Sequence, residues 1–202
     1  MELPCDLSFV SCILFAMHRL LIPLFAFAIL LTACGGGGSV KVDCEKDYWD
    51  GTVGVCLPEG WAALDRETMR QRGLPDETVA AFRSEKSVSG QFPSITITQE
   101  TLLQQVSASD YSDASIRSVS VLPGYTLIDT PSATVDGEEV KLHVFSAQPV
   151  SDEPARRFYQ VSTVSDGVGF TATAVTPLFV EKQLEGEITT VMKSVTFSES
   201  EE

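Results

Sequence analysis

Four stretches of β-strand pattern, joined only by short turns, constrain the fold of this chain more than any other feature of its sequence. The strands are predicted at residues 125–135, 139–148, 157–165 and 167–175. The turns between them are Asp136-Gly137, Ser151-Asp152-Glu153-Pro154 and Asp166-Gly167. Turns of this length and composition join neighbouring strands of a hairpin, so each strand runs antiparallel to the next. The sequence therefore predicts a twisted antiparallel sheet.

Helices and further strands flank these four strands. We predict helices at residues 64–72, 76–84, 111–121 and 177–192, and strands at 53–57 and 94–98, with 195–198 returning to the sheet. Asp65 and the pair Ser109-Asp110 stand where helix N-caps are expected. The mixture indicates one α+β domain over residues 44–198, followed by an acidic tail at 199–202.

The amino-terminal segment is predicted to be a targeting signal. Residues 20–31 form an uncharged apolar run behind His18-Arg19, and this run is shorter than the roughly 20 residues that a spanning helix needs. Residues 1–16 fit no signal-peptide pattern, so we place the start of translation at Met17; an unusually long leader is the alternative. Residues 1–33 are then a leader and signal peptide that export removes.

The exit from this run, Leu31-Thr32-Ala33-Cys34, resembles the lipobox of bacterial lipoproteins. The resemblance implies that Cys34 receives a diacylglycerol before cleavage in front of it, and that its acyl chains, such as palmitate, anchor the protein to the cell membrane or outer membrane. Residues 34–43 then form a lipidated, glycine-rich linker that holds the domain outside the cytoplasm. The alternative is an ordinary signal peptide followed by a chance cysteine.

Two cysteines remain for the domain. Cys44 and Cys56 form an even pair in an exported, oxidising compartment, which favours a disulfide. A hairpin with the three-residue loop Trp49-Asp50-Gly51 would place Cys44 directly opposite Cys56. A zinc site is disfavoured, because the exported chain offers only His143 as a further His or Cys ligand.

Several short segments carry a family resemblance over residues 53–197. They are Pro58-Glu59-Gly60-Trp61, Leu122-Pro123-Gly124-Tyr125, Ala133–Gly137, Thr173-Ala174 and Ser194-Val195-Thr196-Phe197. This pattern resembles the PsbP-like family, including its bacterial DcrB-like lipoprotein branch. The resemblance implies a single-domain α/β/α sandwich, in which helices cover both faces of a twisted antiparallel sheet. It implies no reaction, and it does not transfer the photosystem role of the plant and cyanobacterial members.

A search for catalytic groups yields no candidate residue. His143 is the only histidine of the exported chain, and we predict that it lies on the exposed face of a strand with Lys141 and Phe145. No G-x-S-x-G segment exists to present a serine to it. The paired acids, among them Glu185 and Glu187, are predicted to be solvated, and Arg156-Arg157 to balance nearby acids. We therefore predict a protein that is not an enzyme and has no catalytic residue, cofactor or metal ligand.

Charge narrows the class of partner. The chain has 14 Lys and Arg against 28 Asp and Glu, a net charge of −14, so nucleic acid is excluded as a partner because phosphate binding needs clustered cations. The favoured function is an envelope lipoprotein whose accessory domain binds an envelope protein. The alternative is a lipoprotein that binds a small molecule or metal for a transporter. A deep pocket that gathered Trp61, Tyr125, His143, Arg157 and Tyr159 would favour this alternative.

Overall fold

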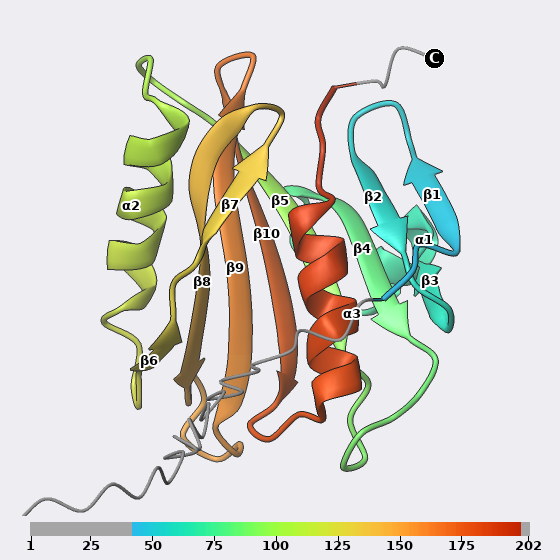
Figure 1. Cartoon of the computed structure of the whole chain (residues 1–202). Helices are drawn as coiled ribbons and strands as arrows, with labels where there is room; N and C mark the ends of the chain where they lie inside the picture. The colour runs from blue at the N-terminus through green and yellow to red at the C-terminus, as the bar shows by residue number, and fades with distance from the viewer. Residues whose placement is uncertain (1–41, 199–202) are drawn as a thin grey trace, which may run out of the picture. The chain divides into compact units, whose positions relative to one another are not determined.

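The structure, a computed structural model, describes residues 42–198 and is organised around one antiparallel sheet (Figure 1). Eight strands form this sheet in the order β3-β4-β5-β10-β9-β8-β6, and β7 also pairs with β8. The strands are β3 (Trp61–Ala63), β4 (Thr78–Ser84), β5 (Ser94–Thr101), β6 (Thr126–Asp129), β7 (Ser132–Val135), β8 (Glu138–Ala147), β9 (Arg156–Ser165) and β10 (Val168–Pro177). The predicted antiparallel order of the last strands is confirmed, since β8, β9 and β10 follow one another as hairpins.

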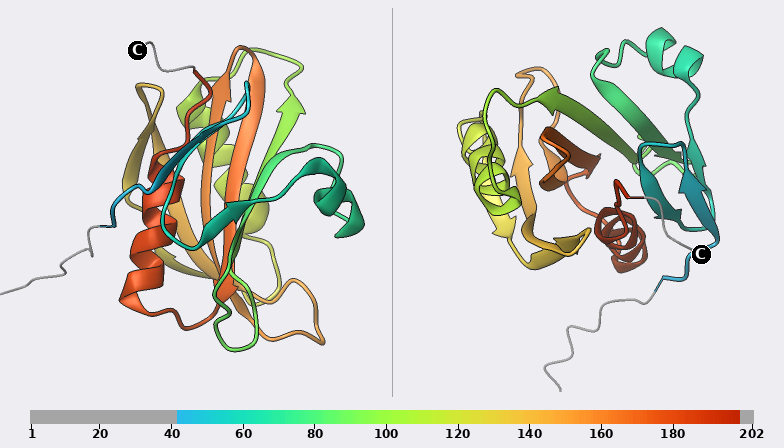
Figure 2. Two further views of the ribbon diagram at one scale, coloured as in Figure 1. Left: turned by 90° about the vertical axis from the view of Figure 1, so that its right-hand side faces the viewer. Right: turned by 90° about the horizontal axis from the view of Figure 1, so that it is seen from above.

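Helices cover both faces of the sheet. Helix α2 (Ala108–Val119) packs on β8 and β9, and α3 (Lys182–Lys193) packs on β9 and β10. Neighbouring residues of a strand point to opposite faces, and in β9 Ser162 contacts α2 whereas Tyr159 contacts α3. The view from above in Figure 2 shows the two helices on opposite sides of the curved sheet. The α/β/α sandwich predicted from the sequence is therefore confirmed.

The main apolar core lies between the sheet and α3. Strand residues that point toward α3 alternate with polar ones, and their apolar side chains meet the inner face of the helix. The fully buried members are Phe82, Ile95, Ile97, Leu142, Val161, Ala174, Ile188, Val191 and Met192. Burial of side chains of this size stabilises a fold by about 1.5–3 kcal/mol each, so this layer fixes the position of α3 on the sheet.

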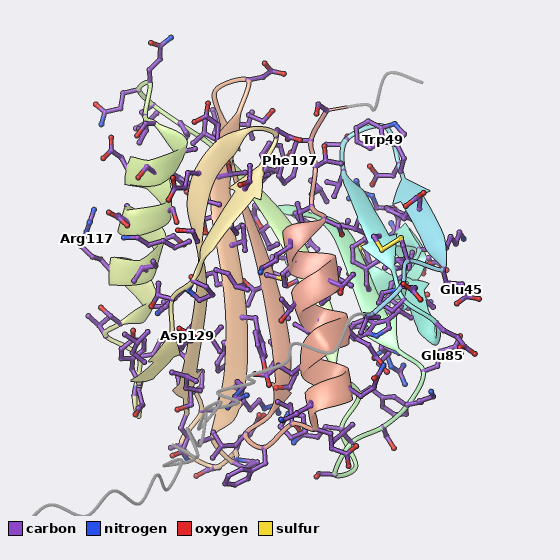
Figure 3. The ribbon with its side chains drawn as sticks, viewed as in Figure 1. Glu45, Trp49, Glu85, Arg117, Asp129 and Phe197 are labelled. Atoms are coloured by element: carbon purple, nitrogen blue, oxygen red, sulfur yellow. A yellow bond between two sulfur atoms is a disulfide. The ribbon has the colours of Figure 1, made fainter. Side chains whose placement is uncertain are left out.

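A hairpin of β1 (Lys46–Trp49) and β2 (Gly54–Leu57) forms a separate two-stranded sheet beside α3. A disulfide joins Cys44 to Cys56, with the Cα atoms 5.4 Å apart (yellow bond in Figure 3). Gly54 and Thr196 exchange two backbone hydrogen bonds of 2.8 and 2.9 Å, which attach the end of the chain to the hairpin. A Cβ atom on Gly54 would lie 2.6 Å from Thr196 Cγ2, so only glycine allows this contact.

The register of this hairpin differs from the prediction. Cys56 faces Asp47, and the loop has the four residues 50–53 in place of three. The cause is the side chain of Asp50, whose Oδ1 accepts hydrogen bonds from the backbone N of Thr52 and Val53 at 2.9 and 2.8 Å. Such a side-chain turn competes with the three-residue loop and extends the connection by one residue.

Residues 76–84 were predicted to be helical, and this prediction is wrong. Residues 78–84 form β4, which pairs with β3 on one side and β5 on the other. Strand β3 itself was not predicted. Asp76-Glu77 followed by Ala80-Ala81 is typical of a helix, but pairing with two strands buries most of the segment and overrides that local preference.

Three other boundaries also differ. Pro177 ends β10 and does not begin the last helix, because α3 starts at Lys182 behind the N-cap Glu181. Ser107, not Ser109 or Asp110, caps α2. Residues 195–198 return to the β1–β2 hairpin through Thr196 and not to the main sheet.

The outer edges of the main sheet are short. One edge is β3, with three residues. At the other edge, residues 125–135 were predicted as one strand, but the structure divides them into β6 and β7. Pro131 lies at the break, because proline has no N–H to donate to a ladder; β6 pairs with the last part of β8 and β7 with the first.

No helix within residues 42–198 is long and apolar enough to cross a membrane. The predicted signal peptide, the predicted lipidation site Cys34, most of the predicted linker and the acidic tail lie outside the described residues.

Candidate binding groove

The sheet face that carries α2 is only partly covered by that helix. Helix α2 lies over β8 and β9, and the neighbouring strands β10 and β5 are left half-exposed on this face. Their outward residues are mainly hydroxyl-bearing, namely Ser94, Thr96 and Thr98 of β5 and Thr171 and Thr173 of β10. Threonine suits a half-exposed strand, because its branched Cβ favours extended backbone while its hydroxyl remains hydrated.

A hollow of about 640 Å³ lies on this exposed part, between α2 and the segment that enters β4. We call it the Gln160 hollow. Thr98, Gln160, Thr171 and Thr173 form its floor, Tyr111 and Ser115 of α2 form one wall, and Pro75 and Glu77 form the other, with Glu100 beside Tyr111. The hollow therefore joins segments that are far apart in the sequence.

Hydrogen bonds hold α2 beside the hollow. The buried Ser162 of β9 donates to Ser115 Oγ of α2 at 2.8 Å, and its hydroxyl also lies 3.0 Å from that of Thr171. Lys141 of the neighbouring strand β8 places its Nζ 2.7 Å from Oδ1 of Asp113 in α2. At the other end of the helix, Arg117 points away from the sheet (Figure 3). These contacts fix the side of α2 that faces the sheet, whereas Arg117 lies on the opposite side of the helix.

Tyr111 positions the carboxylate of Glu100 at the Gln160 hollow. Its hydroxyl donates to Glu100 Oε1 at 2.6 Å. Burial, and next the hydrogen bond to Glu100, raise the pKa of Tyr111 to about 12. A Cβ atom on Gly169 of β10 would lie 2.6 Å from Tyr111 Cζ, so the glycine permits the ring to lie directly on the strand.

Gln160 supplies a buried polar atom to the floor. Its side chain is 7% exposed and lies directly across the strands from the buried His143. No Lys or Arg is found among the described residues that line the hollow, whereas Glu77 and Glu100 are.

His143 lies in the buried part of the same face, and the prediction that it is exposed is wrong. It is 1% exposed, because α2, Tyr125 and neighbouring aromatic rings cover β8. Tyr125 Oη lies 3.0 Å from His143 Nε2, and the Phe145 ring stacks on the imidazole at 4.6 Å between centroids. His143 does not line the Gln160 hollow, although Gln160 is its neighbour across the strands.

We expect His143 to make the fold sensitive to acid. Burial lowers its pKa below the ordinary 6.5, so the unfolded chain takes up this proton at a higher pH than the folded one. Stability is therefore full above about pH 6.5 and falls as the pH drops from there toward the folded pKa, by at most about 1.4 kcal/mol per pH unit. Thermal melts of the untagged protein between pH 7.5 and 5 should show this decline.

The matched variant is His143→Gln, which keeps a polar partner for Tyr125 but does not titrate. Its melting temperature should fall less than that of the wild type between pH 6.5 and 5, because carboxyl groups of ordinary pKa titrate lower. Equal declines in the two proteins would show that His143 is not responsible.

The five residues whose meeting would indicate a small-molecule pocket do not meet. Tyr125 and His143 lie on the α2 side of the sheet, and the other three contact α3. Trp61 Nε1 donates to Glu187 Oε2 at 3.0 Å, and Arg157 Nη1 contacts Glu185 Oε1 at 3.1 Å. Glu185 and Glu187 were predicted to be merely solvated; instead they bind core-facing side chains. Arg156 and Arg157 do balance acids, as predicted, through Glu153 and Glu185.

Within residues 42–198, no three His, Cys, Asp or Glu side chains are grouped so that they could hold a metal ion.

Comparison with known proteins identifies the fold. Neither a protein-family model nor a curated protein sequence matches the chain. Among solved structures, cyanobacterial PsbP (CyanoP) from Synechocystis superposes with a TM-score of 0.54 at 17% identity, over 83% of this chain and 99% of that one. This chain has the PsbP-like fold.

Solved structures of two other proteins are also similar to this chain. The Ran-binding protein Mog1p of Saccharomyces cerevisiae matches with a TM-score of 0.51 at 8% identity, over 75% of this chain and 94% of that one. LpqN, described as involved in cell envelope biogenesis of Mycobacterium tuberculosis, matches with a TM-score of 0.47 at 12% identity, over 75% of this chain and 88% of that one. The PsbP-like resemblance predicted from short segments is confirmed for the fold, and the DcrB-like lipoprotein branch stays a prediction.

Proposed function

We propose that this protein is an exported lipoprotein, anchored through Cys34, whose domain is a non-enzymatic accessory module that binds an envelope protein. The observation that carries the proposal is the half-covered sheet face. A helix layer normally buries the face on which it lies, yet here Thr98, Thr171 and Thr173 remain accessible beside α2.

A second hollow makes this accessible surface long. It has a volume of about 490 Å³ and lies over β4 and the first half of β5, between Leu74 and Phe92. We call it the Phe92 hollow. Thr96 of β5 lines it and Thr98, the next outward residue of the strand, lines the Gln160 hollow. The two hollows together, which we call the groove, suit an extended polypeptide better than one compact small molecule.

The chemistry of the groove supports binding over catalysis. General acid–base work at neutral pH needs a group whose pKa is near 7, within hydrogen-bond reach of the reacting atoms. The one histidine of the described residues is enclosed away from the groove, and the shift in its pKa leaves it neutral. Tyr111 titrates at about 12, far from the working range of a base.

Site-specific photocrosslinking in the host tests this proposal. A benzophenone amino acid replaces Thr98 or Thr173 in the groove, and Glu138, at the exposed start of β8, serves as the matched control site. We expect one adduct of the same mass from both groove positions in the membrane fraction, and none from the control. Adducts from the control alone, or none at any site, would contradict a partner at the groove.

A further inference from the structure

Three loops meet at one end of the domain. They are residues 121–125, which precede β6, residues 148–155, which join β8 to β9, and residues 178–181, which follow β10. The last residues of β8 and β10 both pair with the first residue of β9. The backbone N of Gln148 also donates to Pro123 O at 2.7 Å. We call these three loops the loop end; they lie at the lower end of the domain in Figure 1.

Each loop of the loop end projects a large apolar side chain into solvent. Phe179, Val121 and Val150 are 86%, 82% and 51% exposed. Together with Leu127, at the start of β6, they make up four of the five most exposed large apolar side chains among the described residues. The exposed apolar surface of the domain is therefore concentrated at this end.

The acids of the loop end are largely accompanied by cations. Arg156 contacts Glu153 across the turn that precedes β9. Lys182 directly follows Glu181 at the start of α3. Two of the three acids in these loops thus have a cation beside them, and Asp152 is the third.

The opposite end of the domain is acidic. Its three turns each contain an exposed aspartate, namely Asp50, Asp136 and Asp166. Thr196 brings the first two turns to the same end, because its hydroxyl donates to Asp136 Oδ1 at 2.5 Å and its backbone pairs with the β1–β2 hairpin. We call this the acidic end. The two ends thus differ in both apolar surface and charge.

The linker favours the loop end as the part of the domain that meets a membrane. Strand β1 runs toward the acidic end (Figure 1), so the chain enters the domain from the direction of the loop end. Only residues 35–41 separate Cys34 from Val42, and this connection spans at most about 29 Å. The ten residues of β8, which run between the two ends, already extend about 33 Å. A lipid on Cys34 would therefore hold the loop end nearer to the bilayer.

We propose that the loop end inserts into the headgroup region of the bilayer on which Cys34 is anchored, with Phe179, Val121 and Val150 at the acyl-chain boundary. Apolar side chains on separate loops need no matching pocket in a fluid bilayer, and their insertion removes apolar surface from water. Anionic headgroups repel the acidic end, which favours the same orientation. The proposal rests on the lipid anchor of the proposed function and adds the orientation of the domain.

Quenching by spin-labelled lipid tests this orientation. In the acylated protein with its disulfide, a single added cysteine carries a nitrobenzoxadiazole label. Ser151→Cys places the label at the loop end, and Glu138→Cys, at the exposed start of β8, is the matched control site. The vesicles contain phosphatidylethanolamine, phosphatidylglycerol and a lipid with a spin label near the headgroup. We expect the Ser151→Cys label to lose most of its fluorescence and the Glu138→Cys label to keep it.

Equal quenching at the two sites, or stronger quenching at the control site, would overturn the proposal. A rise in fluorescence of the Ser151→Cys label without quenching would also overturn it, because a second copy or another protein would then cover the loop end. Protein that does not float with the vesicles would instead contradict the lipid anchor, and with it the proposed function. Protein that floats without quenching at Ser151→Cys would overturn the orientation alone.

A second variant tests the apolar side chains themselves. Val150→Ser with Phe179→Ser, in the Ser151→Cys protein, should abolish most of the quenching, and the fold should be kept because both side chains are exposed. The matched control is Leu103→Ser, which removes a fully exposed apolar side chain after the end of β5, away from the loop end. This control should be quenched like the parent protein. Equal quenching in all three proteins would show that Val150 and Phe179 do not hold the loop end in the bilayer.

Discussion

Replacing Cys34 by serine is expected to move this protein from the membrane to the soluble fraction. Lipid attachment needs the thiol, and two or three acyl chains hold a protein stably at a bilayer, whereas one chain holds it only marginally. The measurement is fractionation of host membranes by ultracentrifugation, with incorporation of labelled palmitate as a second readout.

Gly38→Ser is the matched control, because it changes the same linker and keeps Cys34. This variant should stay in the membrane and take up the label. If Cys34→Ser also stayed in the membrane pellet after a carbonate wash, the lipid anchor would be disproved. The serine variant should keep its fold, because Cys34 lies outside the domain.

Removing the disulfide should produce the largest loss of stability. For the double variant Cys44→Ser, Cys56→Ser we expect the free energy of unfolding to fall by about 3 kcal/mol, since the bond closes a loop of about 13 residues in the unfolded chain. The hairpin should still form, because Val53, Val55 and Leu57 are buried in the core and Gly54 pairs with Thr196. Urea unfolding followed by circular dichroism measures the change.

A reducing agent distinguishes the effect of losing the disulfide from the effect of the two serine substitutions. It should lower the stability of the wild type to that of the double variant and should leave the double variant unchanged. Peptide mapping of the exported protein without reduction provides the direct check. Recovery of Cys44 and Cys56 as two alkylated thiols would refute the disulfide in the cell.

The sheet and its order were predictable where contacts are local. Asp136-Gly137 and Asp166-Gly167 form tight turns, so β7 must be the neighbour of β8, and β9 the neighbour of β10. Strand β4 could not be recognised in this way. A longer connection separates it from its partner β5, and its other partner, β3, has only three residues. Local helix preference in residues 76–84 was therefore misleading.

The groove left a partial signal in the sequence. The alternation Ser94-Ile95-Thr96-Ile97-Thr98 predicts a strand with one polar face, and that face became the floor of the groove. The wall of Tyr111, and its contact with Glu100 and Gly169, depend on where α2 packs, which no local pattern reports. The same packing buries His143, whose strand alternation by itself indicated an exposed side chain.

The short outer edges of the sheet have a consequence for how copies of the domain meet at high concentration. A long free edge would present unpaired N–H and C=O groups to every neighbouring copy, and strands of other copies would pair with it edge to edge to form aggregates. Here β3 offers three residues and the opposite edge is interrupted at Pro131. A neighbouring copy therefore finds only short, interrupted ladders to extend at these two edges of the sheet.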